Sequence, residues 1–303
     1  MTWLVIHASS QRLSRISRRH LVRFLTIGAA PALVVCSPRR PSHLPSGGQD
    51  TRPVVVGIDA PAGADTRGVE WMKVTIPRVG SLRAAVARPQ GVGPFRTLVL
   101  LHGTHGFAEE YVSLAQEISR HGILAVAACW FSGGTGLGTR FVTPIECPEA
   151  PPMPRAASAD AIRTLDALVQ AVRMLPDVRP DHLALFGHSR GGGAALHYVL
   201  GGGAVQAVVL NSAGYPHELT GRVGDLRVPI LILHGTADGP ADGGSALTRV
   251  EMARTFEASL RQAGKQVEAK YYEGGHNSIF SDSAQYHDEV QQIVAFLARE
   301  LLD

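Results

Sequence analysis

Short apolar runs alternate with longer segments in which hydrophobic residues recur at helical spacing along most of this 303-residue chain. Strand-length apolar runs between amphipathic helices predict an α/β fold with a mostly parallel central sheet and helices on both faces. Before this alternation, residues 71–76 and 81–88 have the pattern of an antiparallel N-terminal hairpin. The later strands are predicted at residues 97–101, 123–128, 182–186, 205–210, 229–233 and 267–272, and the helices at residues 108–121, 156–174, 192–200, 245–263 and 281–302.

The most informative junction lies where the strand pattern of residues 183–186 meets a glycine-rich turn and then a helix pattern. The turn is Gly187-His188-Ser189-Arg190-Gly191. Its glycines lack the Cβ atoms that would clash in a strained strand-to-helix turn, and such a turn exposes the serine hydroxyl above the sheet. Ser189 is therefore the predicted nucleophile, and we expect His188 beside it to contact the substrate.

Two later strand patterns end in the groups that a serine nucleophile needs. One leads into Asp238 and the other into His276, so the three groups follow the chain order Ser, Asp, His. His276 is predicted to take the hydroxyl proton, and Asp238 to hold the imidazole in one tautomer and offset its positive charge. Aspartate also favours turns, so Asp242 stays open as the replacement acid.

The strand pattern at residues 97–101 runs into a second glycine-rich turn, which contains His102, Thr104 and His105. This turn is predicted to supply the backbone N–H of Thr104, which with that of Arg190 would form an oxyanion hole. Each such donor stabilises the tetrahedral oxyanion by roughly 3–4 kcal/mol. The two histidines have a spacing that suggests a metal, but no third ligand is spaced to complete a zinc site. We therefore expect neither a metal nor an organic cofactor.

These motifs resemble those of the α/β-hydrolase superfamily and, within it, the dienelactone hydrolase-like serine hydrolases. The dienelactone hydrolases carry cysteine as nucleophile, whereas this chain has Ser189, which favours ordinary carboxylic esters as substrates. The strand-to-helix turn that carries Ser189, called the elbow below, also looks like that of secreted, polyester-cleaving cutinase-like enzymes. The resemblance covers roughly residues 70–303 and rests on Leu101-His102-Gly103, Gly187-His188-Ser189-Arg190-Gly191-Gly192, His234-Gly235-Thr236-Ala237-Asp238 and Gly274-Gly275-His276.

Residues 1–36 resemble a twin-arginine export signal. Arg18 and Arg19 precede a largely apolar run, residues 21–35, which is too short and too interrupted for a membrane span of about 20 apolar residues. Cys36 ends this run in a context that looks like a lipoprotein processing site. Export to the periplasm, the cell surface or the medium is predicted, with a lipid on Cys36 as one means of membrane tethering. A cytoplasmic, arginine-rich arm is the alternative.

Residues 37–68 are dense in Pro, Gly, Ser and Arg. Such a composition buries too little apolar surface to order itself, so we predict a flexible linker before one catalytic domain at residues 69–303. The formal net charge of +3 is partly due to arginines that precede this domain. The charge therefore gives no reason to expect a nucleic-acid partner.

The segment 130–155 follows a predicted strand end, and its length and glycines are typical of a substrate-contacting loop or partial lid. Trp130 and Phe131 are predicted to line an acyl or aromatic pocket, with packing in the core as an equal alternative. Cys129 and Cys147 bracket the loop. In an exported protein they are expected to form a disulfide, and two free cysteines are the alternative.

Together these features predict an exported serine hydrolase that cleaves a small-molecule or polymer carboxylic ester through an acyl-enzyme intermediate. A peptidase or an acyltransferase has the same triad and differs in leaving group and water exclusion, which the sequence does not show. A non-catalytic binding protein on the same fold is a further alternative. Such a protein would be expected to have lost triad residues, and here Ser189, Asp238 and His276 are all present.

Overall fold

The structure is a computed structural model that describes residues 52–61, 64 and 68–302. The predicted export signal, with Arg18, Arg19 and Cys36, lies outside the described residues, as does most of the predicted linker. Among the helices that are described, none combines the length and the apolar character needed to cross a bilayer.

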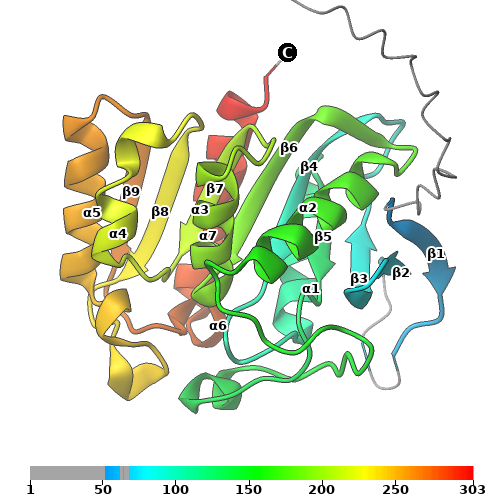
Figure 1. The fold of residues 1–303 in the computed structure, drawn as a ribbon, viewed down its shortest axis with the longest axis horizontal. Helices are drawn as coiled ribbons and strands as arrows, with labels where there is room; N and C mark the ends of the chain where they lie inside the picture. Colours follow the sequence, from blue (N-terminus) through cyan, green and yellow to red (C-terminus); the bar gives the residue numbers. More distant parts are fainter. Residues whose placement is uncertain (1–51, 62–63, 65–67, 303) are drawn as a thin grey trace, which may run out of the picture. The chain divides into compact units, whose positions relative to one another are not determined.

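One nine-stranded sheet forms the centre of the domain. The strands are β1 (Val54–Ile58), β2 (Glu70–Ile76), β3 (Gly80–Ala87), β4 (Phe95–Leu101), β5 (Leu124–Ala128), β6 (Val178–His188), β7 (Ala207–Asn211), β8 (Ile230–Gly235) and β9 (Val267–Tyr272). Their order is β1-β2-β3-β5-β4-β6-β7-β8-β9 (Figure 1). The first three strands and the β3–β5 pair run antiparallel, and the remaining pairs are parallel. The predicted α/β fold with an antiparallel opening is confirmed.

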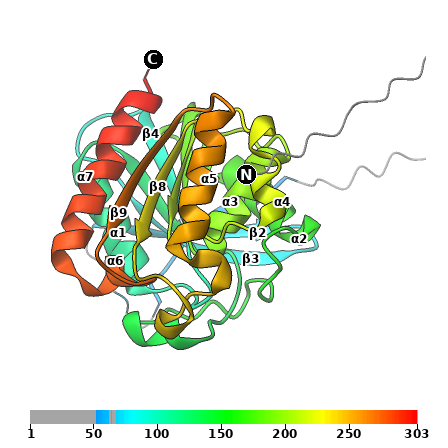
Figure 2. The ribbon, with the colours of Figure 1, turned by 90° about the vertical axis from the view of Figure 1, so that its left-hand side faces the viewer.

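Helices cover both faces of this sheet (Figure 2). They are α1 (Glu109–Arg120), α2 (Ala159–Arg173), α3 (Arg190–Leu200), α4 (His217–Thr220), α5 (Val250–Gln262), α6 (Ser278–Ser281) and α7 (Ser283–Glu300), with 3₁₀ turns at Leu137–Phe141, Val223–Asp225, Pro240–Asp242 and Ala246–Thr248. α1 and α7 contact each other on one face, whereas α2, α3 and α5 lie on the other. Each long helix turns an apolar stripe to the sheet, as the sequence periodicity predicts.

Side-chain caps set the starts of two helices later than the hydrophobic pattern predicts. Ser158 accepts a hydrogen bond from Ala161 N, so α2 begins at Ala159. Asp282 accepts from the backbone N–H groups of the first turn of α7, which begins at Ser283. A capping oxygen satisfies N–H groups that have no partner inside the helix, and this fixes the helix start more sharply than periodicity does.

The structure corrects the linker prediction at β1. Residues 54–58 lie inside the stretch predicted to be a flexible linker, yet they pair antiparallel with β2. The strand is mostly exposed, with Val54 and Val56 facing solvent. Composition missed it because an edge strand is held by backbone hydrogen bonds to its neighbour and needs little apolar burial of its own.

The parallel part of the sheet decides where the functional groups gather. β4, β6 and β8 are buried on both faces over most of their length, as parallel strands covered by helices should be. Because these strands and β9 run in the same direction, the loops after their carboxyl ends meet at one edge of the sheet. Those loops carry Ser189, Asp238 and His276, together with the turn at residues 102–106 that contains Thr104 and is called the oxyanion turn below.

Candidate active site

Ser189 sits on a strained turn between β6 and α3. Its backbone has φ 52° and ψ −114°, a conformation that non-glycine residues rarely adopt. A Cβ on Gly187 would lie 2.4 Å from the backbone of Gly191, and a Cβ on Gly191 would lie 2.3 Å from Leu101 O. The two glycines are therefore required by close backbone packing around the elbow. Ser189 N–H donates to Asn211 O at 2.9 Å, which ties the turn to β7.

The three predicted triad residues meet at this turn. His276 Nε2 lies 2.9 Å from Ser189 Oγ, and His276 Nδ1 lies 2.9 and 3.0 Å from the two Asp238 carboxylate oxygens. A carboxylate only accepts, so Nδ1 carries the proton and Nε2 presents its lone pair to the serine hydroxyl. The Asp238 and His276 side chains are almost completely buried. This arrangement can remove the hydroxyl proton of Ser189 as the oxygen attacks a carbonyl.

The alternative acid, Asp242, is not placed on His276. Its carboxylate lies 3.6 Å from the guanidinium of Arg140, and its backbone O accepts from Asn277 Nδ2 at 2.7 Å. Asp242 therefore ties neighbouring loops together, and Asp238 is the acid in contact with the imidazole.

Two residues that the sequence analysis did not assign hold the acid. Thr248 Oγ1 donates to Asp238 Oδ1 at 2.7 Å, and His234 Nε2 lies 2.6 Å from Thr248 O and 3.4 Å from Asp238 Oδ2. Burial lowers the pKa of His234, so its ring is neutral and donates from Nε2. A Cβ on Gly244 would lie 2.4 Å from Asp238 Oδ1, which keeps that position free of a side chain. The spacing of residues along the chain does not predict the role of Thr248, because only the folded conformation of the loop after β8 brings it next to Asp238.

Three hydrogen bonds from two side chains, Trp130 and Tyr111, hold the turn after β4. Trp130 Nε1 donates to His102 O at 3.0 Å, and Gly103 N–H donates to the hydroxyl of Tyr111 at 3.0 Å. This hydroxyl lies 2.8 Å from His105 Nε2 and, since it already accepts from Gly103, donates its proton there. No hydrogen bond to another described residue uses the backbone N–H of Thr104. The turn therefore leaves this predicted oxyanion donor available.

Arg190, the other predicted donor, follows Ser189 at the first position of α3. Its backbone N–H likewise makes no hydrogen bond to a described residue. Its half-buried side chain reaches back over the oxyanion turn, where Nε donates to Thr104 Oγ1 at 3.2 Å and an Nη donates to Pro154 O at 2.9 Å. The guanidinium thus links the elbow, the oxyanion turn and the end of the long loop.

The expectation that Trp130 and Phe131 line a substrate pocket is wrong. Both side chains are fully buried, and their rings pack on His102 with centroids 5.9 and 4.3 Å away. The core alternative holds, because these residues support the oxyanion turn from behind. His188 also fails as a substrate contact: it is fully buried and lies against the ring of His276, with centroids 5.0 Å apart.

The histidines around the triad are neutral. Burial lowers the pKa of His102 to about 3 and that of His105 to about 4. Burial together with the neighbouring His276 and His105 keeps the pKa of His188 well below its usual value. The described residues contain no group of three His, Cys, Asp or Glu side chains arranged to hold a metal ion.

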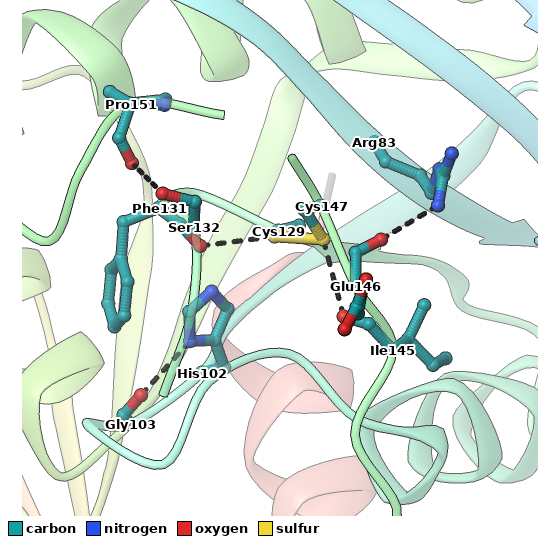
Figure 3. Close-up of a disulfide and its surroundings, with 10 residues drawn as sticks. All are labelled: Arg83, His102, Gly103, Cys129, Phe131, Ser132, Ile145, Glu146, Cys147 and Pro151. Atoms are coloured by element: carbon teal, nitrogen blue, oxygen red, sulfur yellow. Dashed lines mark hydrogen bonds between the residues drawn. A yellow bond between two sulfur atoms is a disulfide. The ribbon is translucent and has the colours of Figure 1, made fainter. Parts of the chain in front are cut away.

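A disulfide joins Cys129 to Cys147 and closes the first part of the long loop (Figure 3). The prediction of a disulfide is confirmed, and the alternative of two free cysteines is wrong. Arg83 of β3 donates to Glu146 O at 2.8 Å and holds the second half of the closed loop against the sheet. The loop is therefore fastened both covalently and by a hydrogen bond.

The glycines of this loop serve two purposes: Gly133 and Gly136 adopt positive φ with open space around them, whereas Gly134 allows close packing. A Cβ on Gly134 would lie 1.7 Å from His105 O, so no other residue fits there without moving the backbone. Thr135 N–H donates to Thr104 O at 2.8 Å. The long loop thus lies directly on the oxyanion turn. A cavity of about 250 Å³ lies between the two and is lined by His105, Gly106, Phe107, the two disulfide cysteines and residues 132–134 and 144–148.

The fold and this site together define the protein's class. A mostly parallel sheet, a serine at a strained strand-to-helix turn and an acid and histidine on later strand ends are the features of the α/β-hydrolase fold. The family model described as "Dienelactone hydrolase family" matches residues 82–297, which is most of the chain. The chain therefore belongs to the dienelactone hydrolase family and is a hydrolase, which confirms the resemblance seen in the motifs. No curated protein sequence matches it.

Solved structures with the same fold include several esterases. A putative dienelactone hydrolase from Klebsiella pneumoniae has a TM-score of 0.56 at 18% identity, over 81% of this chain and 99% of that one. An esterase from Pyrococcus furiosus has a TM-score of 0.60 at 13% identity, over 77% and 93%. Acetyl xylan esterase 1 from a Thermoanaerobacterium species has a TM-score of 0.56 at 14% identity, over 81% and 88%. At these identities the likeness shows the shared fold.

Proposed function

We propose that this hydrolase cleaves carboxylic esters through an acyl-enzyme formed on Ser189. The observation that carries the proposal is the pair of contacts made by His276, 2.9 Å to Ser189 Oγ and 2.9 Å to an Asp238 oxygen. These are hydrogen-bond distances suited to proton transfer before any substrate binds. Membership of a family that includes dienelactone hydrolases and the fold shared with esterases support an ester as the substrate.

In the first half of the proposed reaction, His276 Nε2 takes the proton of Ser189 as Oγ attacks the ester carbonyl carbon. The carbonyl oxygen becomes negative, and the backbone N–H groups of Thr104 and Arg190 stabilise it. The imidazolium then gives its proton to the leaving alcohol, and the acyl group stays on Ser189. Asp238 remains ionised and offsets the charge of the imidazolium.

In the second half, water replaces the alcohol. His276 removes a proton from this water as it attacks the acyl carbon, and the collapse of the second tetrahedral intermediate returns the proton to Ser189. We propose that the cavity of about 250 Å³ beside the oxyanion turn binds one part of the substrate, and that the long loop lining it selects which substrates fit. Small-molecule and polymer esters both remain candidate substrates.

Active-site labelling with a fluorophosphonate, followed by a panel of short and long esters, amides and lactones, tests this function. We expect labelling at Ser189 and turnover of esters. Ser189→Ala should lower kcat by about 10⁵- to 10⁶-fold with an unchanged circular dichroism spectrum, since the hydroxyl contributes little to packing. More than a few per cent residual activity would refute the nucleophile assignment, and turnover restricted to amides would replace the esterase proposal with a peptidase.

We further propose export through the twin-arginine-type signal at residues 1–36, with a lipid on Cys36 as one form of the mature protein. Mass spectrometry of protein from an export-competent host should show an N-terminus at or near Cys36, with or without a diacylglycerol adduct. Arg18→Lys combined with Arg19→Lys should block export. Full-length, active cytoplasmic protein with no dependence on this pair would contradict the proposed localisation.

A further inference from the structure

Glu289 of α7 carries a completely buried carboxyl group that the proposed reaction does not use. Burial raises its pKa to about 8, so the group is mostly neutral at pH 7. Burying a titratable side chain is costly, and a well-packed apolar residue often serves a core better. A buried carboxyl group at this position is therefore expected to have a role that its hydrogen bonds define.

Amide side chains contact both carboxyl oxygens of Glu289. Asn211 Nδ2 donates to Oε2, and the amide end of Gln285, one turn earlier on α7, lies 2.7 Å from Oε1. The neutral acid carries its proton on Oε1, and the Gln285 oxygen, which otherwise has no partner, accepts it when that amide rotates, so Oε2 stays an acceptor for Asn211. Asn211 is the last residue of β7, and its backbone O accepts the N–H of Ser189. One asparagine thus joins the buried carboxyl group to the backbone of the elbow.

The bond to Glu289 decides which way the Asn211 amide faces. Because its NH₂ group points to the carboxyl group, its Oδ1 faces His188 Nδ1, 2.6 Å away. An amide oxygen only accepts a hydrogen bond, so Nδ1 must carry the proton of the neutral His188 ring. The carboxyl group of Glu289 therefore fixes the tautomer of His188, two residues along the hydrogen-bonded chain.

The His188 ring forms a wall of the triad. It is tilted against His276, with centroids 5.0 Å apart, and stacked on His105, with centroids 5.2 Å apart. His188 Nε2 is buried and has no hydrogen-bond partner among the described residues. A proton moved to Nε2 would leave the Nδ1 lone pair facing Asn211 Oδ1 at 2.6 Å, two acceptors with no proton between them, which is costly and would push the ring to shift against His276.

We propose that Glu289, acting through Asn211 and His188, is a positioning residue for the catalytic histidine and the elbow. The chain holds the Asn211 amide in one orientation, and this keeps His188 as the Nδ1–H tautomer at a fixed place beside His276. All three side chains are buried, so they are expected to act through His276 and the elbow and not on the substrate directly. The inference rests on the proposed function of Ser189 and His276, and it names the residues that set their geometry.

Two substitutions at Glu289 separate positioning from bulk packing. Glu289→Gln should keep kcat within about threefold, because its Oε1 still accepts from Asn211 and its NH₂ group can donate to the Gln285 oxygen in place of the acid proton. Glu289→Met removes the acceptor of the Asn211 amide and frees it. We expect kcat to fall roughly 10- to 100-fold with KM changed less than about threefold, as for a mispositioned catalytic group.

Asp288→Asn is the matched control. Asp288 is the adjacent carboxylate on the same helix, but it is half-exposed and pairs with Lys270 at 2.6 Å. Its loss should leave kcat and KM unchanged. Equal losses in Glu289→Gln and Glu289→Met, or no loss in a folded Glu289→Met protein, would overturn the proposal.

The ¹⁵N NMR spectrum of the histidine rings provides a readout that does not depend on turnover. Wild-type His188, assigned by comparison with His188→Asn, should be the Nδ1–H tautomer, and Glu289→Met should show a mixture of tautomers. If that variant does not fold, the wild-type tautomer decides: Nε2–H overturns the proposal and Nδ1–H supports it. A wild-type protein with the Nδ1–H tautomer but no hydrolysis of any ester would refute the proposed function instead.

Discussion

Ser189 lies between two groups of residues. The acid–base side consists of side chains, and the oxyanion side consists of backbone N–H groups. On the acid–base side the working groups are side chains, since His276 and Asp238 reach each other from the loops after β9 and β8. On the oxyanion side the groups that we propose to work are backbone N–H groups, those of Thr104 and Arg190. Side chains there, such as Tyr111, hold the backbone in place.

This difference determines what a mutation can reach. A side-chain group is removed by changing one residue, so the acid–base side is open to direct tests. A backbone donor stays when its own side chain changes, and the oxyanion side can be tested only through the residues that hold the turn. We therefore expect the largest losses from the acid–base side and graded losses from the supports of the oxyanion turn.

The largest of these effects is expected for Asp238→Asn, on the order of 10⁴-fold in kcat, because an amide can no longer fix the Nδ1–H tautomer of His276. Asp242→Asn is the matched control and should change kcat little, since its carboxylate faces Arg140. Steady-state kinetics on one activated ester compare the two. If the two effects came out reversed, Asp242 would be the orienting acid.

Tyr111→Phe tests the oxyanion side through its support. The variant leaves Gly103 N–H and His105 Nε2 without their shared partner, so the turn should loosen around Thr104. We expect kcat to fall roughly 10- to 100-fold while KM changes less than about threefold. Tyr198→Phe, which loses a hydroxyl that donates to Asp166 at 3.2 Å, should leave kcat unchanged. Equal effects in both variants would make the loss a matter of general stability.

Removal of the disulfide should affect substrate choice more than chemistry. Cys129→Ser with Cys147→Ser frees the loop that lies on the oxyanion turn and lines the cavity beside it. We expect KM to rise and the preferred acyl length to change, while kcat on a small activated ester falls less than about tenfold. Cys36→Ser controls for the loss of a cysteine outside the domain. Collapse of activity on every ester would mean that the loop holds the triad together, and unaltered selectivity would exclude it from the pocket.

The smallest effect on activity is expected for Glu289→Gln. This substitution should instead change how the free energy of unfolding depends on pH. The pKa of Glu289 is about 8 in the folded protein and close to its ordinary value of 4.5 when unfolded. Between these values the folded state holds a proton that the unfolded state has released. The free energy of unfolding therefore falls as pH rises, by up to about 1.4 kcal/mol per pH unit, and stays low above the folded pKa.

Glutamine does not titrate, so the variant should lack this part of the pH dependence. Urea unfolding of both proteins at several values between about pH 5 and pH 8 measures the difference. We expect the wild type to lose more stability than the variant over this interval, by a few kcal/mol in all. Parallel curves for the two proteins would contradict the raised pKa of Glu289.

Much of this architecture could be predicted because local chemistry and global fold agree. Residues 267–272 alternate apolar and charged residues before two tyrosines, as a half-buried strand does, and form β9; the glycines around Ser189 are required by the elbow itself. The edge strand β1 escaped prediction because its hydrogen bonds come from β2. Trp130 and Phe131 were ambiguous for a similar reason: an aromatic residue at a strand end packs inward or lines a pocket according to what lies beside it.

The sequence by itself determined which residue types gather at the candidate site, because the proposed nucleophile, base and acid are a serine, a histidine and an aspartate directly after strand patterns. The tertiary structure alone decided which groups hold them. Thr248 reaches Asp238 through a loop, and Glu289 reaches His188 through an asparagine on another element. Such contacts depend on distances across the fold, and no spacing along the chain encodes them.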